Sequence, residues 1–332
     1  MIVKDVAVDP SHGGRLYVAL NSGVYRSNDY GESWVPAGQG LPEDASLVSL
    51  ALDPNEPSTL YASGYVYGQN KTTPLVYRST DAGGTWTPLG VDAPELDGQS
   101  IGSVMVAPTE PRTLFAGTNK GALLISRDGG NHWSSQPLAS PSWGMRIALA
   151  SGNYNRVYVA ADKSGDPVVY KSDDGGITWK AIEGVFPREG GVFSNLEVAP
   201  ADPNVVYLGM AFRVYKSRDA GETWRDITEG LPRTKHIGPL VVSPSNADEV
   251  YVALYEVQCK GTCWVASMSK SDDGGKTWTD VLTDWQDVYI TTLKLDPSAT
   301  DRLYMGTNGL GLYKSDDRGL TRHLVSTGLP GR

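Results

Sequence analysis

Ser27-Asn28-Asp29-Tyr30-Gly31-Glu32-Ser33-Trp34 is the stretch that decides the fold, because its pattern returns six more times along the chain. Each return keeps a serine, an aspartate two residues later and a glycine two residues after that. The serines step by 52, 47, 46, 45, 54 and 44 residues. A period in the forties matches one four-stranded blade of a β-propeller. The chain is therefore predicted to be all-β, with seven blades of four antiparallel strands and the repeated turn between the third and fourth strands.

The octapeptide has a structural role in this prediction. Ser and Asp side chains accept hydrogen bonds from backbone N–H groups in turns, and Gly adopts positive φ without a Cβ clash. Six copies end in Trp, a plate that fills the wedge between blades and stabilises the fold by about 2–3 kcal/mol; the seventh has Arg322 instead. The aspartates assigned to these turns are Asp29, Asp81, Asp128, Asp174, Asp219, Asp273 and Asp317.

Each unit holds four short strands, called A to D. Strand A ends in Pro or a substitute, strand B carries a Leu-Tyr or Val-Tyr pair, strand C enters the octapeptide, and strand D begins at its Trp. No segment has a sustained period of 3.6 residues, so helix should be scarce. One propeller over residues 1–332 is expected, with approximate blades 1–40, 41–92, 93–139, 140–186, 187–232, 233–284 and 285–332.

The two ends of the chain predict how the ring closes. Met1 begins at a strand A, and Gly328-Leu329-Pro330 follows the last strand D. Blades 1 and 7 should therefore each be built from one end, without an exchanged strand. Closure is then expected to depend on side-chain packing between these two blades.

The octapeptide resembles the Asp-box, or BNR repeat, of sialidases and related β-propellers, and all seven units resemble it. Seven copies make the chain similar to photosystem II stability/assembly factor-like propellers and to one propeller of family 74 glycoside hydrolases. The catalytic motifs of these enzymes are not matched. The sialidase Phe-Arg-Ile-Pro string has as its nearest equivalent Phe212-Arg213-Val214-Tyr215, and the early catalytic-aspartate motif of family 74 falls where blade 1 reads Ala19-Leu20-Asn21-Ser22-Gly23.

Composition narrows the class of function. The chain has 29 Lys and Arg against 38 Asp and Glu, a net charge of −9 that argues against a nucleic-acid partner. No apolar run approaches 18 residues, so no membrane insertion is expected. No cofactor is implied, and the histidines His12, His132, His236 and His323 lack metal-site spacing. A monomer in an extracytoplasmic or secreted location is expected, although no signal peptide precedes the first strand. Cys259 and Cys263 form either a tight disulfide or two free thiols.

One face of the propeller is the expected ligand face. The D-to-A and B-to-C connections share it, and we call it the first face; the octapeptide turns lie on the second face. The B-to-C connections are long in blades 2 and 6, and long loops on a rigid scaffold commonly carry function. Aromatic side chains here either bind a ligand or pack under their own loops. The candidates are Trp143, Trp264, Trp285, Tyr65 and Tyr67, together with His236.

Aligning the seven strands A on their terminal Pro gives a second candidate region. The residue five positions earlier is polar or charged in six of seven blades: Asp5, Ser49, Ser103, Arg146, Asn195, Pro239 and Thr292. Such a ring should line the mouth of the central channel, either as ligand contacts, Arg146 and Asn195 among them, or as a hydrated surface. Glu197 and Lys294 lie two residues deeper.

These features favour a non-catalytic scaffold that binds a protein partner or a glycan on the first face. The alternative is a glycoside hydrolase or related polysaccharide-active enzyme, which needs two carboxyl groups about 5–10 Å apart. Weak candidates for such a pair are Asp287, Glu256 and Asp5.

Overall fold

Each octapeptide forms a tight turn that joins the last two strands of a four-stranded sheet. The computed structural model describes residues 1–68, 71–90, 96, 98–109, 112–138, 145–187, 193–258 and 263–330. Over these residues 28 strands pair into seven antiparallel sheets, and no α-helix is present. Trp143 and Cys259 lie outside the described residues, so the expectations for that aromatic ring and for the cysteine pair stay predictions.

The first four blades follow the chain in order. Blade 1 contains β1 (Val3–Val8), β2 (Leu16–Leu20), β3 (Gly23–Ser27) and β4 (Val35–Pro36). Blade 2 contains β5 (Ala45–Leu52), β6 (Leu60–Tyr67), β7 (Thr72–Ser79) and β8 (Thr87–Pro88). Blade 3 contains β9 (Ile101–Ala107), β10 (Thr113–Thr118), β11 (Ala122–Ser126) and β12 (Ser134–Pro137). Blade 4 contains β13 (Arg146–Ala150), β14 (Asn153–Lys163), β15 (Asp166–Ser172) and β16 (Lys180–Ile182).

The last three blades repeat the same order. Blade 5 contains β17 (Phe193–Val198), β18 (Val206–Met210), β19 (Arg213–Ser217) and β20 (Arg225–Asp226). Blade 6 contains β21 (His236–Val242), β22 (Val250–Gln258), β23 (Cys263–Ser271) and β24 (Thr279–Gln286). Blade 7 contains β25 (Ile290–Asp296), β26 (Ala299–Thr307), β27 (Leu312–Ser315) and β28 (His323–Leu324).

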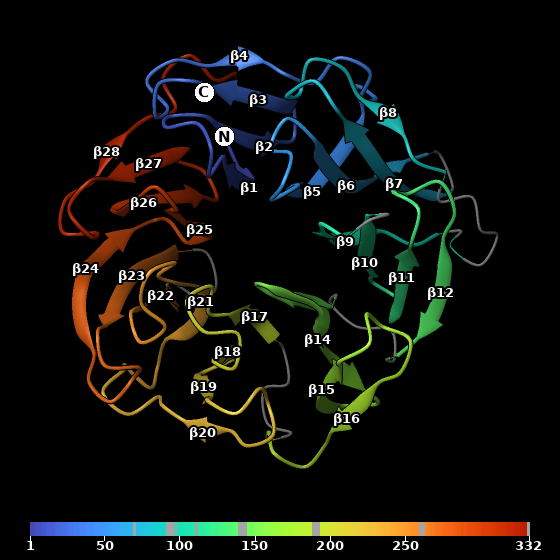
Figure 1. Cartoon of the computed structure of the whole chain (residues 1–332). Helices are drawn as coiled ribbons and strands as arrows, with labels where there is room; N and C mark the ends of the chain where they lie inside the picture. The colour runs from blue at the N-terminus through green and yellow to red at the C-terminus, as the bar shows by residue number, and fades with distance from the viewer. Residues whose placement is uncertain are drawn as a thin grey trace.

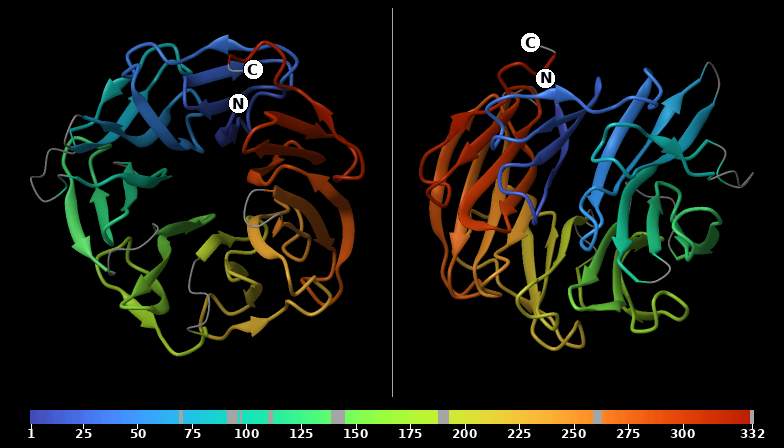
Figure 2. Two further views of the ribbon diagram at one scale, coloured as in Figure 1. Left: turned by 180° about the vertical axis from the view of Figure 1, so that it is seen from behind. Right: turned by 45° about the horizontal axis from the view of Figure 1, so that its top comes forward.

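The seven sheets stand around a central axis (Figures 1 and 2). Within each sheet the strands are neighbours in chain order, so the first strand of every blade is innermost and the fourth outermost. Each innermost strand contacts the innermost strand of the next blade, and β25 contacts β1 to complete the circle. The predicted fold, an all-β propeller of seven four-stranded blades, is confirmed.

The octapeptide turn in blade 5 shows how the repeated residues act. The Ser217 hydroxyl donates to Asp219 Oδ1 at 2.8 Å and accepts from the Gly221 N–H at 2.8 Å. The Asp219 carboxylate accepts from the Thr223 N–H at 2.8 Å and from its hydroxyl at 2.6 Å. Gly221 has a φ of 82°, which favours glycine. The serine-to-aspartate bond recurs in all seven turns.

The octapeptide tryptophans occupy the wedges between blades, as predicted. The indole N–H of Trp34 donates to the Val325 carbonyl, that of Trp86 to Ala37 and that of Trp278 to Ile227, at 2.7, 2.7 and 2.9 Å. In each case the acceptor follows the outermost strand of the preceding blade. Each ring therefore fixes the separation of two neighbouring sheets.

Trp285 fills the one wedge that lacks an octapeptide tryptophan. It lies on β24, is 8% exposed and packs edge to face on Tyr313 of blade 7, with ring centroids 4.7 Å apart. Arg322, which replaces the seventh octapeptide Trp, lies over the Trp285 ring at 4.4 Å. The expectation that Trp285 is a first-face ligand residue is wrong, because β24 continues to Gln286 and carries this ring into the core between blades 6 and 7.

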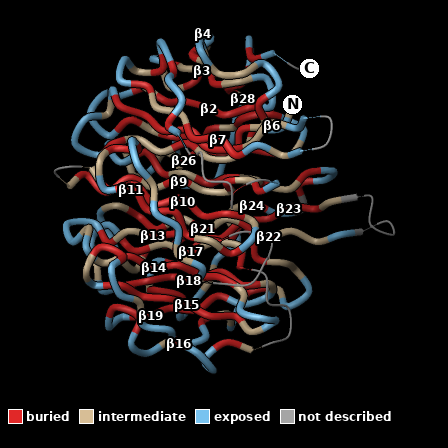
Figure 3. The backbone as a smooth tube through the Cα atoms, turned by 90° about the vertical axis from the view of Figure 1, so that its right-hand side faces the viewer, coloured by how far each residue is buried: buried red, intermediate tan, exposed pale blue. Residues whose placement is uncertain are grey.

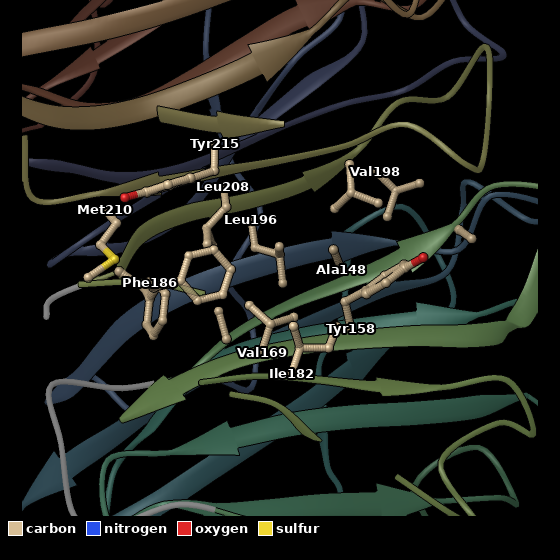
Figure 4. Close-up of a cluster of buried hydrophobic side chains, with 14 residues drawn as sticks. Ala148, Tyr158, Val169, Ile182, Phe186, Leu196, Val198, Leu208, Met210 and Tyr215 are labelled. Atoms are coloured by element: carbon tan, nitrogen blue, oxygen red, sulfur yellow. The ribbon is translucent and has the colours of Figure 1, made fainter. Parts of the chain in front are cut away.

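Apolar packing between blades supplies the core. Figure 4 shows the wedge between blades 4 and 5, where Tyr158, Val169 and Ile182 face Leu196, Leu208 and Met210. Phe186 packs edge to face against the rings of Phe193, Tyr215 and Trp224. Buried residues run along the strands and exposed residues gather in the connections (Figure 3). In the described part of the chain no helix is long and apolar enough to cross a membrane.

The ring closes between blades 7 and 1 without an exchanged strand, as the sequence predicts. The sheet of blade 1 uses residues 3–36 and that of blade 7 uses residues 290–324. Side chains of both blades form one apolar cluster that includes Val6, Leu16, Tyr304 and Val325. The Thr291 hydroxyl adds a hydrogen bond of 2.6 Å to the Val3 carbonyl.

Candidate functional site

The long B-to-C connections of blades 2 and 6 are extended hairpins. In blade 6, β22 and β23 remain paired out to Gln258 and Cys263, and in blade 2, β6 and β7 remain paired out to Tyr67 and Thr72. The sequence predicts loops here, whereas in the structure strand pairing continues through both segments. The hairpin of blade 6 thereby carries Tyr255 and Trp264 on its two strands at the first face.

Five aromatic side chains form a continuous row on the first face of blades 5, 6 and 7. Phe212 contacts His236 with ring centroids 4.2 Å apart, and His236 stacks on Tyr255 at 5.0 Å and 12°. Tyr255 then contacts Trp264 at 5.6 Å and Tyr289 at 6.0 Å. Trp264 and Tyr289 close the group at 4.9 Å. We call these five residues the aromatic row.

The elements beneath the aromatic row explain its continuity. Phe212 is in the turn between β18 and β19, His236 begins β21, and Tyr255 and Trp264 lie on the blade 6 hairpin. Tyr289 stands just before β25. Phe212 is 40% exposed, and partial burial lowers the pKa of His236. Burial thus favours the neutral form of the histidine, which packs in the row as one more flat ring.

The predicted first-face aromatics are only partly brought together. Trp264 and His236 lie in the row, but Tyr65 and Tyr67 form a separate edge-to-face pair on blade 2, with centroids 4.8 Å apart. Tyr67 is 70% exposed. Phe212 and Tyr289 were not predicted as site residues, because each is a lone aromatic in a short connection. Only the ring arrangement of the blades shows that they meet.

A charged groove runs beside Phe212 at the edge of the aromatic row. Its volume is about 680 Å³. The Arg213 guanidinium pairs with the Asp226 carboxylate at 2.5 Å. The lining residues are Pro187, Phe212, Arg213, Asp226, Thr228, Glu229 and Arg233. Apolar rings and both signs of charge therefore lie next to one another on this part of the first face.

The polar ring predicted at the channel mouth is present. All seven residues of the ring line one cavity of about 450 Å³, which the innermost strands enclose. Five of these strands have a register shift just before the ring residue, as between Val3 and Asp5 or Phe193 and Asn195, and in β21 the shift spans the ring residue Pro239. Such β-bulges re-aim the side chains that follow them.

Several ring residues also join neighbouring blades. Asp5 accepts from the Leu50 N–H at 3.0 Å, and the Arg146 Nε–H donates to the Ser194 carbonyl at 2.9 Å. The Asn195 side-chain amide donates to the Leu240 carbonyl at 2.5 Å. In each case the partner is on the innermost strand of the next blade. The ring is therefore a structural belt as well as a polar surface.

The three candidate catalytic carboxylates are not assembled into a pair. Asp5 accepts from the Val6 and Leu50 N–H groups, and Lys294 Nζ lies 3.8 Å from its Oδ1. Glu256 faces Val265 on the hairpin, and Asp287 is exposed at a φ of 58°. Within the described residues no hydrogen bond or ion pair connects Glu256 with Asp287. Their catalytic roles stay predictions.

Glu197 is the carboxyl group with the most altered acidity in the channel. Burial raises its pKa to about 7, opposed by Lys294 and assisted by the negative charge of Asp5. Glu197 and Lys294 line both the polar cavity and a second, more apolar cavity of about 430 Å³. They therefore stand at the junction of two sections of the channel, deeper than the ring, as the register predicts.

Comparison with known proteins agrees with this architecture. Residues 58–210 match the family model described as the DUF6242 beta propeller domain. A xyloglucanase from a Paenibacillus species is 26% identical over 324 residues, covering 84% of this chain and 31% of that protein. The photosystem II assembly lipoprotein Ycf48 of a Synechococcus strain is 29% identical over 154 residues, covering 46% of this chain and 41% of that protein. This chain is a seven-bladed β-propeller with relatives among xyloglucanases and Ycf48 proteins.

Solved structures show the same fold. The propeller matches a GH74 xyloglucanase from Xanthomonas campestris with a TM-score of 0.75 at 19% identity, over 96% of this chain and 52% of that one. It matches YCF48 bound to D1 peptide with a TM-score of 0.68 at 16% identity, over 95% of this chain and 91% of that one. The two resemblances seen in the sequence are thus confirmed for the fold.

The propeller spans only part of the enzymes that it resembles. It covers 31% of the Paenibacillus xyloglucanase and about half of the Xanthomonas structure. The relatives thus include both enzymes that act on a polysaccharide and a protein described as an assembly factor.

Proposed function

We propose that this propeller is a non-catalytic binding module that holds a peptide segment of a protein partner across the aromatic row. The observation that carries the proposal is the continuity of five rings across three blades, from Phe212 to Tyr289. Aromatic anchors at the centre of a polar rim are typical of protein interfaces. The charged groove beside Phe212 supplies part of such a rim.

The arrangement of the rings favours a peptide over a sugar. Sugar rings stack on flat aromatic faces. In the row, however, His236 and Tyr255 stack on each other at 12°, and Phe212 packs against His236 with ring centroids 4.2 Å apart. The row therefore offers ring edges and the gaps between them, which fit apolar side chains. The structure of YCF48 bound to D1 peptide shows that a propeller of this fold accommodates a peptide.

The proposal is tested by selecting binders from a displayed library of random peptides and measuring their affinity for the intact propeller. Phe212→Ala and Trp264→Ala should each lower the affinity for the selected peptides at least tenfold. Tyr67→Ala is the matched control, because this ring is exposed on blade 2, and it should change the affinity less than twofold. Selected peptides that bind all three variants equally well would overturn the proposed site.

A hydrolase is the second candidate, since a xyloglucanase aligns with 84% of this chain. In the central channel the carboxyl groups that line a common cavity are Asp5 and Glu197, and the raised pKa of Glu197 suits a general acid. Release of reducing sugar from xyloglucan, abolished by Glu197→Gln, would establish that alternative. Binding of xyloglucan without turnover, lost in Trp264→Ala, would instead assign the aromatic row to a glycan.

A further inference from the structure

The central channel contains an arginine that is not neutralised. The Arg146 Nε–H donates to the Ser194 carbonyl, and its other four N–H groups have no acceptor among the described residues. No described carboxylate forms an ion pair with it, and burial lowers its pKa. Arg146 is half-buried at the channel mouth, and a carboxylate matches its planar guanidinium donors in a bidentate pair.

The other charges of the channel do not compensate Arg146. Asp5 is committed to the backbone N–H groups of Val6 and Leu50 and to Lys294. Glu197 has no hydrogen bond or ion pair among the described residues, and it is only partly ionised at pH 7. Lys4 adds a further cation to the same cavity. The cavity is therefore cationic, although the whole chain has a net charge of −9.

Below this polar level the channel becomes apolar. The second cavity shares Met105, Leu149 and Val198 with the first, together with Glu197 and Lys294, so the two are consecutive sections of one passage. Its further lining includes Val8, Leu52 and Leu295. A molecule that extends from Arg146 toward the second face therefore passes from charged to aliphatic surroundings.

We propose that the channel binds a small amphipathic carboxylate, with its carboxylate on the Arg146 guanidinium and its hydrocarbon part in the apolar section. The two sections, about 450 and 430 Å³, accommodate a medium-chain acid. This site is distinct from the aromatic row, since it uses the innermost strands rather than the outer connections. It does not depend on the proposed peptide function.

The first test measures binding of octanoate to the intact propeller by isothermal titration calorimetry, with acetate and inorganic phosphate as comparison ligands. Octanoate should bind at least tenfold more tightly than either, because only octanoate combines a carboxylate with a hydrocarbon chain that reaches the apolar section. Arg146→Gln should lower the affinity for octanoate at least tenfold. Arg213→Gln changes an arginine outside the channel and should leave that affinity unchanged. Equal binding by Arg146→Gln, or no saturable binding of octanoate to the wild type, would overturn the proposal. Preference for phosphate would overturn the ligand class.

A second variant keeps the test decisive if Arg146→Gln unfolds. Glu197 stands near the bound carboxylate, together with Asp5, Lys294 and Arg146, and its ionisation should repel the ligand. Wild-type affinity for octanoate should therefore rise several-fold between pH 8 and pH 6, as Glu197 gains its proton. Glu197→Gln should remove that dependence and keep the tight binding. A wild-type affinity that does not change with pH would contradict the assigned position of the carboxylate.

Discussion

At the scale of single residues, the repeated turn depends on an ionised aspartate whose carboxylate accepts hydrogen bonds mainly from uncharged N–H and O–H groups. In every octapeptide the aspartate accepts from N–H and O–H groups of the same turn rather than from a cation, His132 in blade 3 being the one titratable donor. The hydroxyl of Thr223 and its backbone N–H lower the pKa of Asp219 to about 2. The backbone N–H and side chain of His132 do the same for Asp128. Hydrogen bonds that favour the ionised form therefore couple the fold to pH.

We expect the propeller to lose stability as the pH falls from about 5 toward 2. Unfolded aspartate titrates near pH 3.9, above the lowered folded-state values, so the ionised form stabilises the fold fully above that range. This contribution is lost as protons bind between the two pKa values. The measurement is the urea midpoint of unfolding, followed by tryptophan fluorescence at pH 7, 4 and 2.5.

Asp219→Asn serves as the control for this pH dependence. It removes one ionisable turn residue, so it should be less stable than the wild type at pH 7. The difference should shrink as the pH approaches 2, where the wild-type carboxyl is also neutral. A difference that stays constant over the whole range would show that the charge of Asp219 does not contribute.

The residues that sequence reasoning placed correctly are those with a repeated local cause. The serine, aspartate and glycine of each turn recur seven times, so their role in forming the turn could be predicted from the sequence alone. Arg146 and Asn195 were placed at the channel mouth because strand A has a fixed register to its Pro. Phe212 and Tyr289 have no such repetition, and their contacts join residues of different blades.

At the scale of elements, unequal strand lengths are the feature that the sequence analysis did not resolve. The outermost strands β4, β8 and β20 have two residues each, whereas β24 has eight. The predicted boundary between blades 6 and 7, at residue 284, separates Trp285 from β24, the strand to which it belongs. The missing tryptophan at Arg322 was visible in the sequence, but its replacement by a ring from the preceding blade depends on how the sheets pack.

Trp285→Ala should destabilise the propeller by about 3–5 kcal/mol, the usual cost of deleting a large buried ring. The ring packs on Tyr313 and beneath Arg322, and it is 8% exposed. Trp264→Ala is the matched comparison, because its ring belongs to the partly exposed aromatic row, and it should cost clearly less. Guanidinium unfolding of both variants measures the difference. Equal losses would mean that Trp285 does not act as the wedge between blades 6 and 7.

At the scale of the whole molecule, closure is one more packed interface between blades. Blades 7 and 1 join through an apolar cluster, the Trp34-to-Val325 hydrogen bond and a 3.2 Å ion pair between Lys314 and Glu32. Blades 1 and 2 join through a similar cluster and the Trp86-to-Ala37 bond. Because every blade is one contiguous segment, no interface depends on a strand from elsewhere in the chain.

This equivalence predicts that the ring tolerates new ends. Met1 and Leu329 pack against the same apolar cluster, so a short flexible linker should be able to join them. A circular permutant opened between the exposed residues Arg233 and Thr234 keeps all seven four-stranded sheets intact. Its unfolding free energy should lie within about 1 kcal/mol of that of the parent, because surface changes away from packed features rarely cost more.

A second circular permutant, opened inside blade 6 between Lys276 and Thr277, is the control. That cut separates β23 from β24 and breaks the turn that Asp273 holds through the Thr277 N–H at 2.9 Å. It should lower the unfolding free energy well beyond 1 kcal/mol, since an octapeptide turn and a wedge that includes Trp278 both lose their covalent support. If the cut between blades were as damaging as the cut within one, the 7–1 interface would have to contribute something that the other six interfaces do not.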